Sequence, residues 1–307
     1  MARYSLGIQP TVSLTLASVF WGVATVISKA LLSSVPPITF LVIQLVPSVC
    51  VLWVLVLAKG VRPLSWEGLV PLTLIGLLNP GLSYTLSMLG LTRTSASVAT
   101  LLWAAEPALI VATAWLLLRE AITARFVIAT AVAACGVLLV SGIVGSGNLT
   151  DTSGYGVTLI LGGVLCCALY TVLSRKIASK IDPLPAVAIQ QTVGLVWVIA
   201  IWPLEPQGGA INNVFALSPK DLLGGAVSGL MYYAAAFWFY LNALRSVPAT
   251  TASIFINLTP VFGVGTAYIF LGERLTQSQW VGAVTILLSV LALMMWAAAP
   301  KAHGSTG

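Results

Sequence analysis

One stretch of this sequence occurs twice, and it constrains the fold more than any other feature. Residues 96–123 read ASVATLLWAAEPALIVATAWLLLREAIT, and residues 249–276 repeat the same frame 153 positions later. Each copy has a proline within an apolar stretch (Pro107 and Pro260) and ends on a Leu-x-Glu-x-x-Thr pattern. The pattern predicts one long transmembrane helix in each copy, with a proline near its middle. Such helices, at corresponding places in two halves of a chain, are typical of transport sites.

Composition identifies the solvent around most of this chain. Hydrophobic residues make up 59% of the 307 residues and charged residues only 7%, against about 25% charged in ordinary soluble domains. A chain this apolar must expose much of its surface to lipid, where helices satisfy their own backbone polar groups. We therefore predict an all-α polytopic membrane protein. The four cysteines lie within apolar stretches, so we expect small packing residues and no metal site.

Breaks at charged, proline and glycine clusters divide the chain into ten apolar segments, each about long enough to cross a bilayer as a helix. They cover residues 11–32, 37–58, 66–90, 95–118, 123–145, 155–178, 183–204, 219–243, 249–271 and 277–298. We expect the first five segments to form one repeat (11–145) and the other five to form a second (155–298). A short polar tail follows (299–307).

A second alignment supports the two repeats. At an offset of 146 residues, identical residues pair as Thr25/Thr171, Val26/Val172, Ser28/Ser174, Ser33/Ser179, Pro37/Pro183, Ile43/Ile189 and Gln44/Gln190. Because five is an odd number of spans, the second repeat must begin on the opposite side of the membrane from the first. The sequence therefore predicts two inverted five-helix repeats.

The distribution of positive charge predicts the orientation. If the N-terminus is cytoplasmic, ten lysines and arginines lie on the inner side and four on the outer side (Lys29, Arg93, Lys220 and Arg274). Positive charge collects in cytoplasmic loops, so both termini are expected in the cytoplasm. The cations form no run, which argues against nucleic acid as a partner. We expect a small-molecule substrate and membrane lipid as partners, and both a monomer and a homodimer stay open.

These features resemble one transporter family, the EamA branch of the drug/metabolite transporter superfamily. The resemblance covers nearly the whole chain. It rests on Glu106-Pro107 with Leu118, Glu120 and Thr123, on Pro260 with Leu271, Gly272, Glu273 and Thr276, and on Trp21-Gly22 through Ser28-Lys29. Within the family the chain resembles bacterial amino-acid exporters of the YddG type. This implies export of aromatic and other neutral amino acids across the inner (plasma) membrane of a bacterium. Thr259 replaces the glutamate of the first copy, so an acidic role is not duplicated.

Glu106 is the acidic residue near the centre of a predicted span, while the other seven lie at or beyond helix ends. A charged carboxylate at that depth costs at least about 2.5–3.5 kcal/mol, so it must be protonated, paired or hydrated. As a functional group, Glu106 could relay protons or contact the amino group of a zwitterionic substrate. The structural alternative is a protonated carboxyl that hydrogen-bonds a neighbouring helix.

Aromatic and amide side chains at mid-span depth are further candidates for substrate binding. Tryptophan and tyrosine normally gather at membrane interfaces, so deeper ones suit a cavity, although packing or lipid contact is the alternative for each. The predicted substrate-binding residues are Trp21, Asn79, Tyr84, Trp103, Glu106, Tyr170, Tyr232, Trp238 and Asn257. Tyr232 occupies the position equivalent to Asn79. Trp103 and Glu106 are three residues apart, which places them on one face of a continuous helix.

Three prolines are candidate hinges. Pro80, Pro107 and Pro260 each remove a backbone donor and free a carbonyl in the preceding turn. At membrane depth such carbonyls are tolerated where they face protein or a water-filled cavity. A hinge, a carbonyl ligand and a fixed kink are all compatible with the sequence.

Together the motifs predict a secondary transporter that works by alternating access around a central cavity, without a cofactor. An intramembrane enzyme is disfavoured because the single histidine, His303, lies in the polar tail and the aspartates lie outside span interiors. Multidrug, sugar or nucleotide-type transport by the same fold stays an alternative, and a channel is disfavoured by the repeated prolines. A single mid-span acid favours downhill export over proton coupling.

Overall fold

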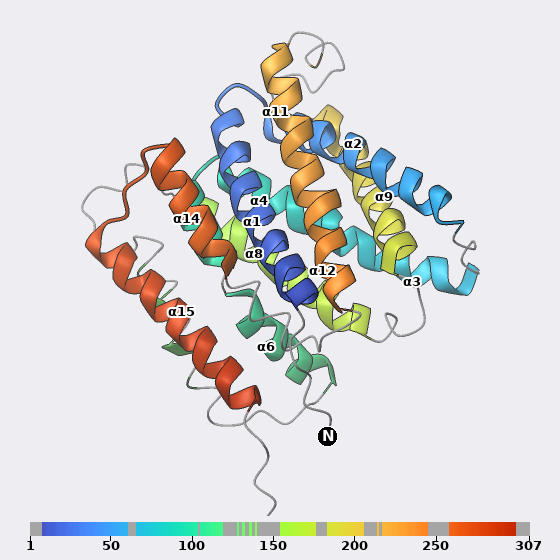
Figure 1. Cartoon of the computed structure of the whole chain (residues 1–307). Helices are drawn as coiled ribbons and strands as arrows, with labels where there is room; N and C mark the ends of the chain where they lie inside the picture. The colour runs from blue at the N-terminus through green and yellow to red at the C-terminus, as the bar shows by residue number, and fades with distance from the viewer. Residues whose placement is uncertain are drawn as a thin grey trace, which may run out of the picture.

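The structure, a computed structural model, describes residues 8–60, 66–103, 105–118, 154–175, 183–205, 217–244 and 258–298, with isolated positions at 214 and between 128 and 139. All regular structure in these residues is helical (Figure 1). The elements are α1 (Ile8–Leu31), α2 (Pro37–Ala58), α3 (Trp66–Gly76), η1 (Leu77–Leu82), α4 (Ser83–Leu91), α5 (Ala96–Trp103), α6 (Glu106–Leu118), α8 (Gly154–Arg175), α9 (Pro183–Ile201), η2 (Trp202–Leu204), α11 (Pro219–Gly229), η3 (Leu230–Ala235), α12 (Ala236–Leu244), α14 (Leu258–Phe270) and α15 (Gln277–Ala298).

Six of the predicted spans are helices long and apolar enough to cross a membrane. These six are Gln9–Leu31, Pro37–Ala58, Gly68–Leu91, Gly154–Leu173, Leu184–Leu204 and Pro219–Tyr240. Large apolar side chains such as Leu57, Ile269 and Phe270 are exposed on the surface of the bundle, as expected of helices that face lipid. The chain is a multi-pass membrane protein. Most of the predicted segment 123–145 lies outside the described residues.

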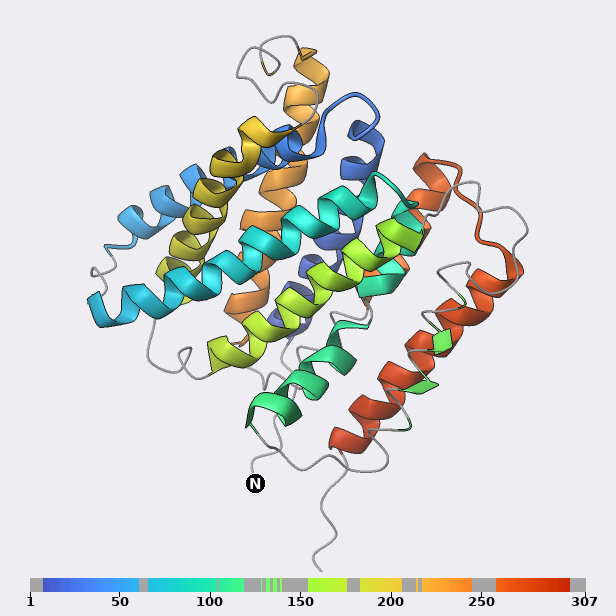
Figure 2. The ribbon, with the colours of Figure 1, turned by 180° about the vertical axis from the view of Figure 1, so that it is seen from behind.

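Helices at equivalent places in the two predicted repeats pack in equivalent ways. α2 packs against its counterpart α9. α12 is the counterpart of α4, and α1 is the counterpart of α8. α4 packs on α8 (Figure 2), and α12 packs on α1 in the same way. In the same way α3 packs on α9 while α11 packs on α2, and α6 packs on α8 while α14 packs on α1. The core is therefore formed by contacts between helices of the two predicted repeats.

Counterpart helices run in opposite directions. α9 ends where α2 begins, because Glu205 after α9 accepts a hydrogen bond from the N–H of Thr39 in the first turn of α2 (3.1 Å). α1 ends beside the end of α4, where Lys29 donates to the Leu91 carbonyl (3.0 Å). Gly90 in that same turn of α4 packs against the first turn of α8. α1 thus ends at the side of the bundle where its counterpart α8 begins.

Residues 96–118 form two helices, so the prediction of one continuous helix is wrong. α5 ends at Trp103 and α6 begins at Glu106, with Ala105 in a turn. The break falls at Pro107, which has no N–H to donate to the preceding turn and whose ring crowds that turn, so it favours a new helix start there. Pro47, by contrast, lies inside the continuous helix α2. Trp103 and Glu106 therefore do not share the face of one helix. The counterpart Pro260 likewise lies in the first turn of a helix, α14.

The third and eighth spans contain matching irregular segments. η1 and η3 stand 153 residues apart, at equivalent places in the predicted repeats; η3 is π-helical, and η1 is a kink between two helical stretches. In η1, Asn79 has non-helical backbone angles (φ −146°, ψ 117°) just before Pro80, whose ring lies against Gly194 of α9. π-helical turns inside α-helices occur frequently at functional sites. These two segments therefore indicate where in the bundle a site should be sought.

Glu205 holds the beginning of α2. Its carboxylate accepts bonds from the N–H of Ile38 (2.6 Å) and from both the N–H and the hydroxyl of Thr39 (3.1 and 2.7 Å). The indole of Trp202 donates to the same hydroxyl (2.8 Å), and Glu205 is buried. The carboxylate thus satisfies helix N–H groups that have no partner within α2.

We predict that Glu205→Ala lowers the free energy of unfolding by about 1–3 kcal/mol, because it leaves buried donors without an acceptor. The measurement is the thermal unfolding midpoint of the purified chain in detergent. Lys220→Ala, an exposed change in the first turn of α11, is the control and should shift stability by less than about 0.5 kcal/mol. An unchanged midpoint for Glu205→Ala would show that this contact contributes nothing to stability.

Candidate functional site

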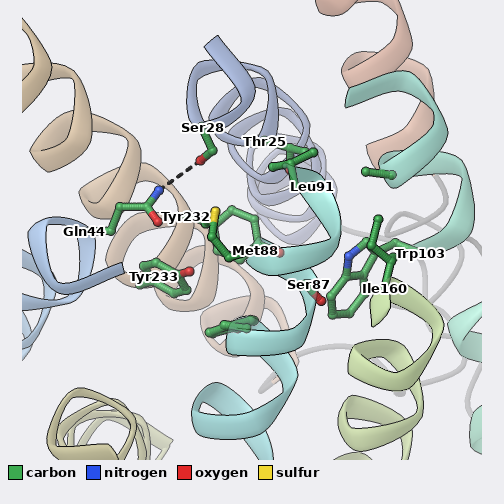
Figure 3. Close-up of a pocket in the computed structure, with 12 residues that line it drawn as sticks. Thr25, Ser28, Gln44, Ser87, Met88, Leu91, Trp103, Ile160, Tyr232 and Tyr233 are labelled. Atoms are coloured by element: carbon green, nitrogen blue, oxygen red, sulfur yellow. Dashed lines mark hydrogen bonds between the residues drawn. The ribbon is translucent and has the colours of Figure 1, made fainter. Parts of the chain in front are cut away.

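A small cavity lies between the two sets of helices, near the ends of α1 and α4 and the beginning of α2. Its volume is about 40 Å³, which is room for a few water molecules. The lining residues are Thr25, Ser28, Gln44, Tyr84, Ser87, Met88, Leu91, Ala99, Trp103, Ile160, Tyr232 and Tyr233. They come from α1, α2, α4, α5, α8 and η3, so both predicted repeats contribute (Figure 3). Three of the predicted site residues, Tyr84, Trp103 and Tyr232, are among them.

Three tyrosines form the aromatic side of this central cavity. The rings of Tyr84 and Tyr232 lie edge to face, with centroids 5.6 Å apart and planes at 88°. The ring of Tyr233 lies 4.8 Å from each of them. Such edge-on and tilted arrangements are the favoured geometry of aromatic pairs. Tyr84 comes from α4 and the other two from η3, so the cluster joins helices of the two predicted repeats.

Gln44 forms the polar side of the cavity. Its Nε2 donates to the hydroxyl of Ser28 on α1 (3.0 Å) and to that of Ser228 on α11 (2.9 Å). Its Oε1 is buried and has no hydrogen-bond partner among the described residues, and the same holds for the hydroxyl oxygen of Ser87. A buried polar atom without a partner is costly unless water or a ligand supplies one. The cavity can therefore bind water or a polar group of a ligand that supplies these missing hydrogen bonds.

Glu106 lies at the start of α6 and does not line this cavity. Its Oε1 accepts a hydrogen bond from the thiol of Cys167 on α8 (3.3 Å). Cys167 is buried and Glu106 is partly exposed. Tyr232 and Tyr240 are close enough to the carboxyl group to interact with it electrostatically. The carboxyl is thus surrounded by polar groups from the second predicted repeat, which is how an acid at membrane depth is accommodated.

Two other predicted residues connect helices beside the cavity but do not line it. The ring of Trp21 packs edge-on against Phe237 and Tyr240, with centroids 5.4 and 5.6 Å away, and so joins α1 to α12. The hydroxyl of Tyr170 on α8 donates to Oε1 of Gln190 on α9 (2.9 Å). In this conformation both residues serve packing between spans.

The structure does not bring the remaining candidates to the cavity. Asn79 is buried in η1, and its Oδ1 has no hydrogen-bond partner in the part of the chain that the structure describes. Trp238 is 38% exposed, and its ring contacts that of the neighbouring Phe239 (4.9 Å). Asn257 lies outside the described residues. A substrate contact by any of these three stays a prediction.

A larger groove of about 850 Å³ opens on the other face of α4. It lies between the α1–α2 connection, the end of α4, the start of α8 and the end of α9. Thr85 and Leu89 of α4 and Thr92 just after it line the groove, whereas the α4 residues that line the central cavity are Tyr84, Ser87, Met88 and Leu91. α4 therefore separates the two spaces. Since no predicted substrate-binding residue lines the groove, the central cavity is the candidate site.

Sequence reasoning missed the uncharged polar residues of the site. Thr25, Ser28, Gln44 and Ser87 carry its hydrogen-bonding groups, and none was a candidate. A signal was present, because Gln44 is identical to its repeat counterpart Gln190 and an amide within an apolar span is costly to bury. Both glutamines do bind polar side chains of neighbouring helices.

The structure defines a multi-pass membrane protein with a buried polar site. Its helices are apolar enough to cross a membrane, helices of each predicted repeat pack on helices of the other, and both repeats line the cavity. The sequence agrees with one family of such proteins. The profile of the EamA-like transporter family matches residues 11–142 and again residues 154–295. The chain belongs to the EamA-like transporter family.

Curated proteins from bacteria, archaea and plants are similar to most of this chain. The chain is 27% identical over 285 residues to the uncharacterized transporter YvbV of Bacillus subtilis, covering 92% of this chain and 91% of that protein. It is 23% identical over 283 residues to an uncharacterized transporter of Archaeoglobus fulgidus, covering 90% and 95%. A chloroplastic WAT1-related protein of Arabidopsis thaliana is 27% identical over 284 residues, covering 88% of this chain and 66% of that protein.

A solved structure has the same fold. One crystal structure of a protein superposes with a TM-score of 0.62 at 16% sequence identity, covering 94% of this chain and 97% of that one. At this identity the likeness extends to the fold alone.

Proposed function

We propose that this chain is a secondary transporter that exports amino acids, aromatic and neutral ones included, from a bacterial cell by alternating access. In the proposed arrangement, ten spans form two inverted five-helix repeats in the inner membrane, with both termini in the cytoplasm. Membership of a transporter family and the opposite directions of counterpart helices support it. The two sets of helices would tilt against each other around the cavity between them.

The observation that carries the proposal is the composition of the cavity wall. Aromatic rings and uncharged hydrogen-bonding groups line it, which suits a small solute that has both an apolar side chain and polar ends. The cavity is too small for a whole amino acid, since ligand sites usually measure about 300–1,000 Å³. A solute could therefore enter only after the helices around Tyr84 and Tyr232 move apart, as alternating access requires.

The test is uptake of a labelled amino-acid panel into vesicles that contain the purified chain, with and without a pH gradient. We expect saturable uptake of aromatic and neutral amino acids and acceleration of labelled uptake by unlabelled amino acid inside the vesicle. A channel would give neither saturation nor this counterflow. Downhill export predicts the same initial rate with and without the gradient, whereas proton coupling predicts a rate that follows the gradient. Uptake of sugars or nucleotides in place of amino acids would overturn the proposed substrate.

A further inference from the structure

The orientation of the Gln44 side-chain amide is fixed by its neighbours. The hydroxyl of Ser28 donates to the Ala24 carbonyl (2.8 Å), and the hydroxyl of Ser228 donates to the Gly225 carbonyl (2.9 Å). A hydroxyl has a single proton to donate, so each serine can only accept a bond from Gln44. Both serines therefore require the NH₂ group of the amide, and a flipped amide would leave three oxygens facing one another.

This orientation directs the amide oxygen of Gln44 toward the cavity. Gln44 lines the cavity and is only 1% exposed, and its Oε1 has no hydrogen-bond partner in the part of the chain that the structure describes. Figure 3 shows the amide nitrogen on the side of Ser28 and the oxygen on the side of Tyr232. The site therefore presents a fixed, unsatisfied acceptor to whatever enters the cavity.

The groups around this acceptor favour a cation. Tyr84, Tyr232 and Tyr233 place three aromatic rings at the same cavity, and aromatic faces attract ammonium groups. No lining residue among those described carries a charge, so neither a lysine nor an arginine competes for the acceptor. An ammonium group is small enough for a space that holds a few water molecules.

We infer that Gln44 Oε1 and the tyrosine cluster form the subsite that binds the primary ammonium group of the transported solute. The inference rests on the proposed function, because it assigns one end of an amino acid to this cavity. It separates the ammonium subsite from Glu106, which does not line the cavity and accepts a hydrogen bond from Cys167. The rest of the solute occupies the space that opens when the surrounding helices separate.

The experiment compares two ligands that differ in the ammonium group, L-phenylalanine and 3-phenylpropanoate. Their dissociation constants are measured by titration calorimetry on the purified full chain, and phenylalanine uptake is followed in vesicles. We expect the wild-type chain to bind phenylalanine at least about ten-fold more tightly, since a hydrogen bond to a charged group contributes about ten- to a hundred-fold in affinity. Gln44→Met should remove most of this preference while it changes the affinity for 3-phenylpropanoate by less than about three-fold.

Gln190→Met is the matched control, because Gln190 is the repeat counterpart of Gln44 but its Oε1 already accepts a bond from Tyr170 (2.9 Å). It should keep the preference for phenylalanine. Should Gln44→Met fail to fold, Tyr232→Leu and Tyr232→Phe test the same subsite. The leucine variant should lose about three-fold or more of the preference and the phenylalanine variant should retain it.

Two negative results have different meanings. If folded Gln44→Met and Tyr232→Leu both keep the wild-type preference while phenylalanine is still transported, the subsite is overturned and the proposed function stands. If the wild-type chain transports no amino acid of the panel, the proposed function fails and the inference fails with it.

Discussion

Glu106→Gln is expected to lower the initial rate of amino-acid uptake by about ten-fold or more while the protein still inserts into the membrane. Glutamine has nearly the same shape as glutamate, and its Oε1 can still accept the bond from Cys167. It cannot carry a charge or exchange a proton, so the lost rate measures the chemistry of the carboxyl group and not its volume. A charge-assisted hydrogen bond in a low-dielectric site contributes about 1.5–3 kcal/mol, which corresponds to this loss of rate. Uptake per amount of inserted protein in vesicles is the measurement.

Two neighbouring cysteines provide the controls for this prediction. Cys167→Val removes the thiol that donates to Glu106 and should lower the rate less, by about two- to five-fold, since a thiol is a weak donor and the carboxyl group itself stays in place. Cys166→Val alters the adjacent, partly exposed side chain and should leave the rate unchanged. Normal uptake by Glu106→Gln would assign Glu106 to helix packing and leave the cavity tyrosines and Gln44 as the polar site.

The repeat pattern predicted more of the structure than any single motif did. It paired Asn79 with Tyr232, and the structure has an irregular segment at each of these two positions, a kink in η1 and a π-helical turn in η3. Glu273, the glutamate of the second Leu-x-Glu-x-x-Thr pattern, lies in the turn after α14 and caps a neighbouring helix: its carboxylate accepts bonds from the N–H groups of Ala96 and Ser97 at the start of α5 (3.0 and 2.9 Å). Symmetry is readable from sequence because identical residues in two copies must satisfy the same local geometry.

The break between α5 and α6 shows what hydrophobicity alone does not predict. Residues 96–118 are mostly apolar, so their composition does not distinguish one continuous helix from two. The break falls at Pro107, which has no N–H for the preceding turn, but Pro47 lies inside the continuous α2, so the presence of a proline does not decide between them either. Trp238 shows a second limit of prediction from sequence. Its position along the span could be predicted, but whether its side chain is exposed depends on which helices pack against that face.

The cavity as a whole depends on long-range contacts. Residues between positions 25 and 233 line it, and no local sequence pattern predicts that α1, α5 and η3 contact the same cavity. What the sequence does carry is a set of small residues where helices cross closely, as is common between helices in membranes. Gly229 is the tightest of these crossings near the site, since a Cβ atom there would overlap the main chain of Gln44.

Gly229→Ala is therefore expected to lower the free energy of unfolding by about 1–3 kcal/mol or more, the usual cost of overfilling a packed site. The added methyl would lie 2.5 Å from the Gln44 Cα and closer still to its carbonyl oxygen, and backbone cannot yield as a flexible side chain does. α11 and α2 would have to separate, which would also displace Gln44 from the cavity. We expect a lower thermal unfolding midpoint in detergent together with reduced uptake.

The same substitution at Gly265 should have the opposite sign. Gly265 lies within α14, and a Cβ atom there would have no neighbour within 4 Å. With no clash, alanine only improves helix propensity, by about 1 kcal/mol. Gly229→Ala and Gly265→Ala thus add the same methyl to two helices, and only the packing around it differs. Equal stabilisation by both would mean that α2 and α11 cross less closely than the structure shows, and the fixed position of the Gln44 amide would lose its support.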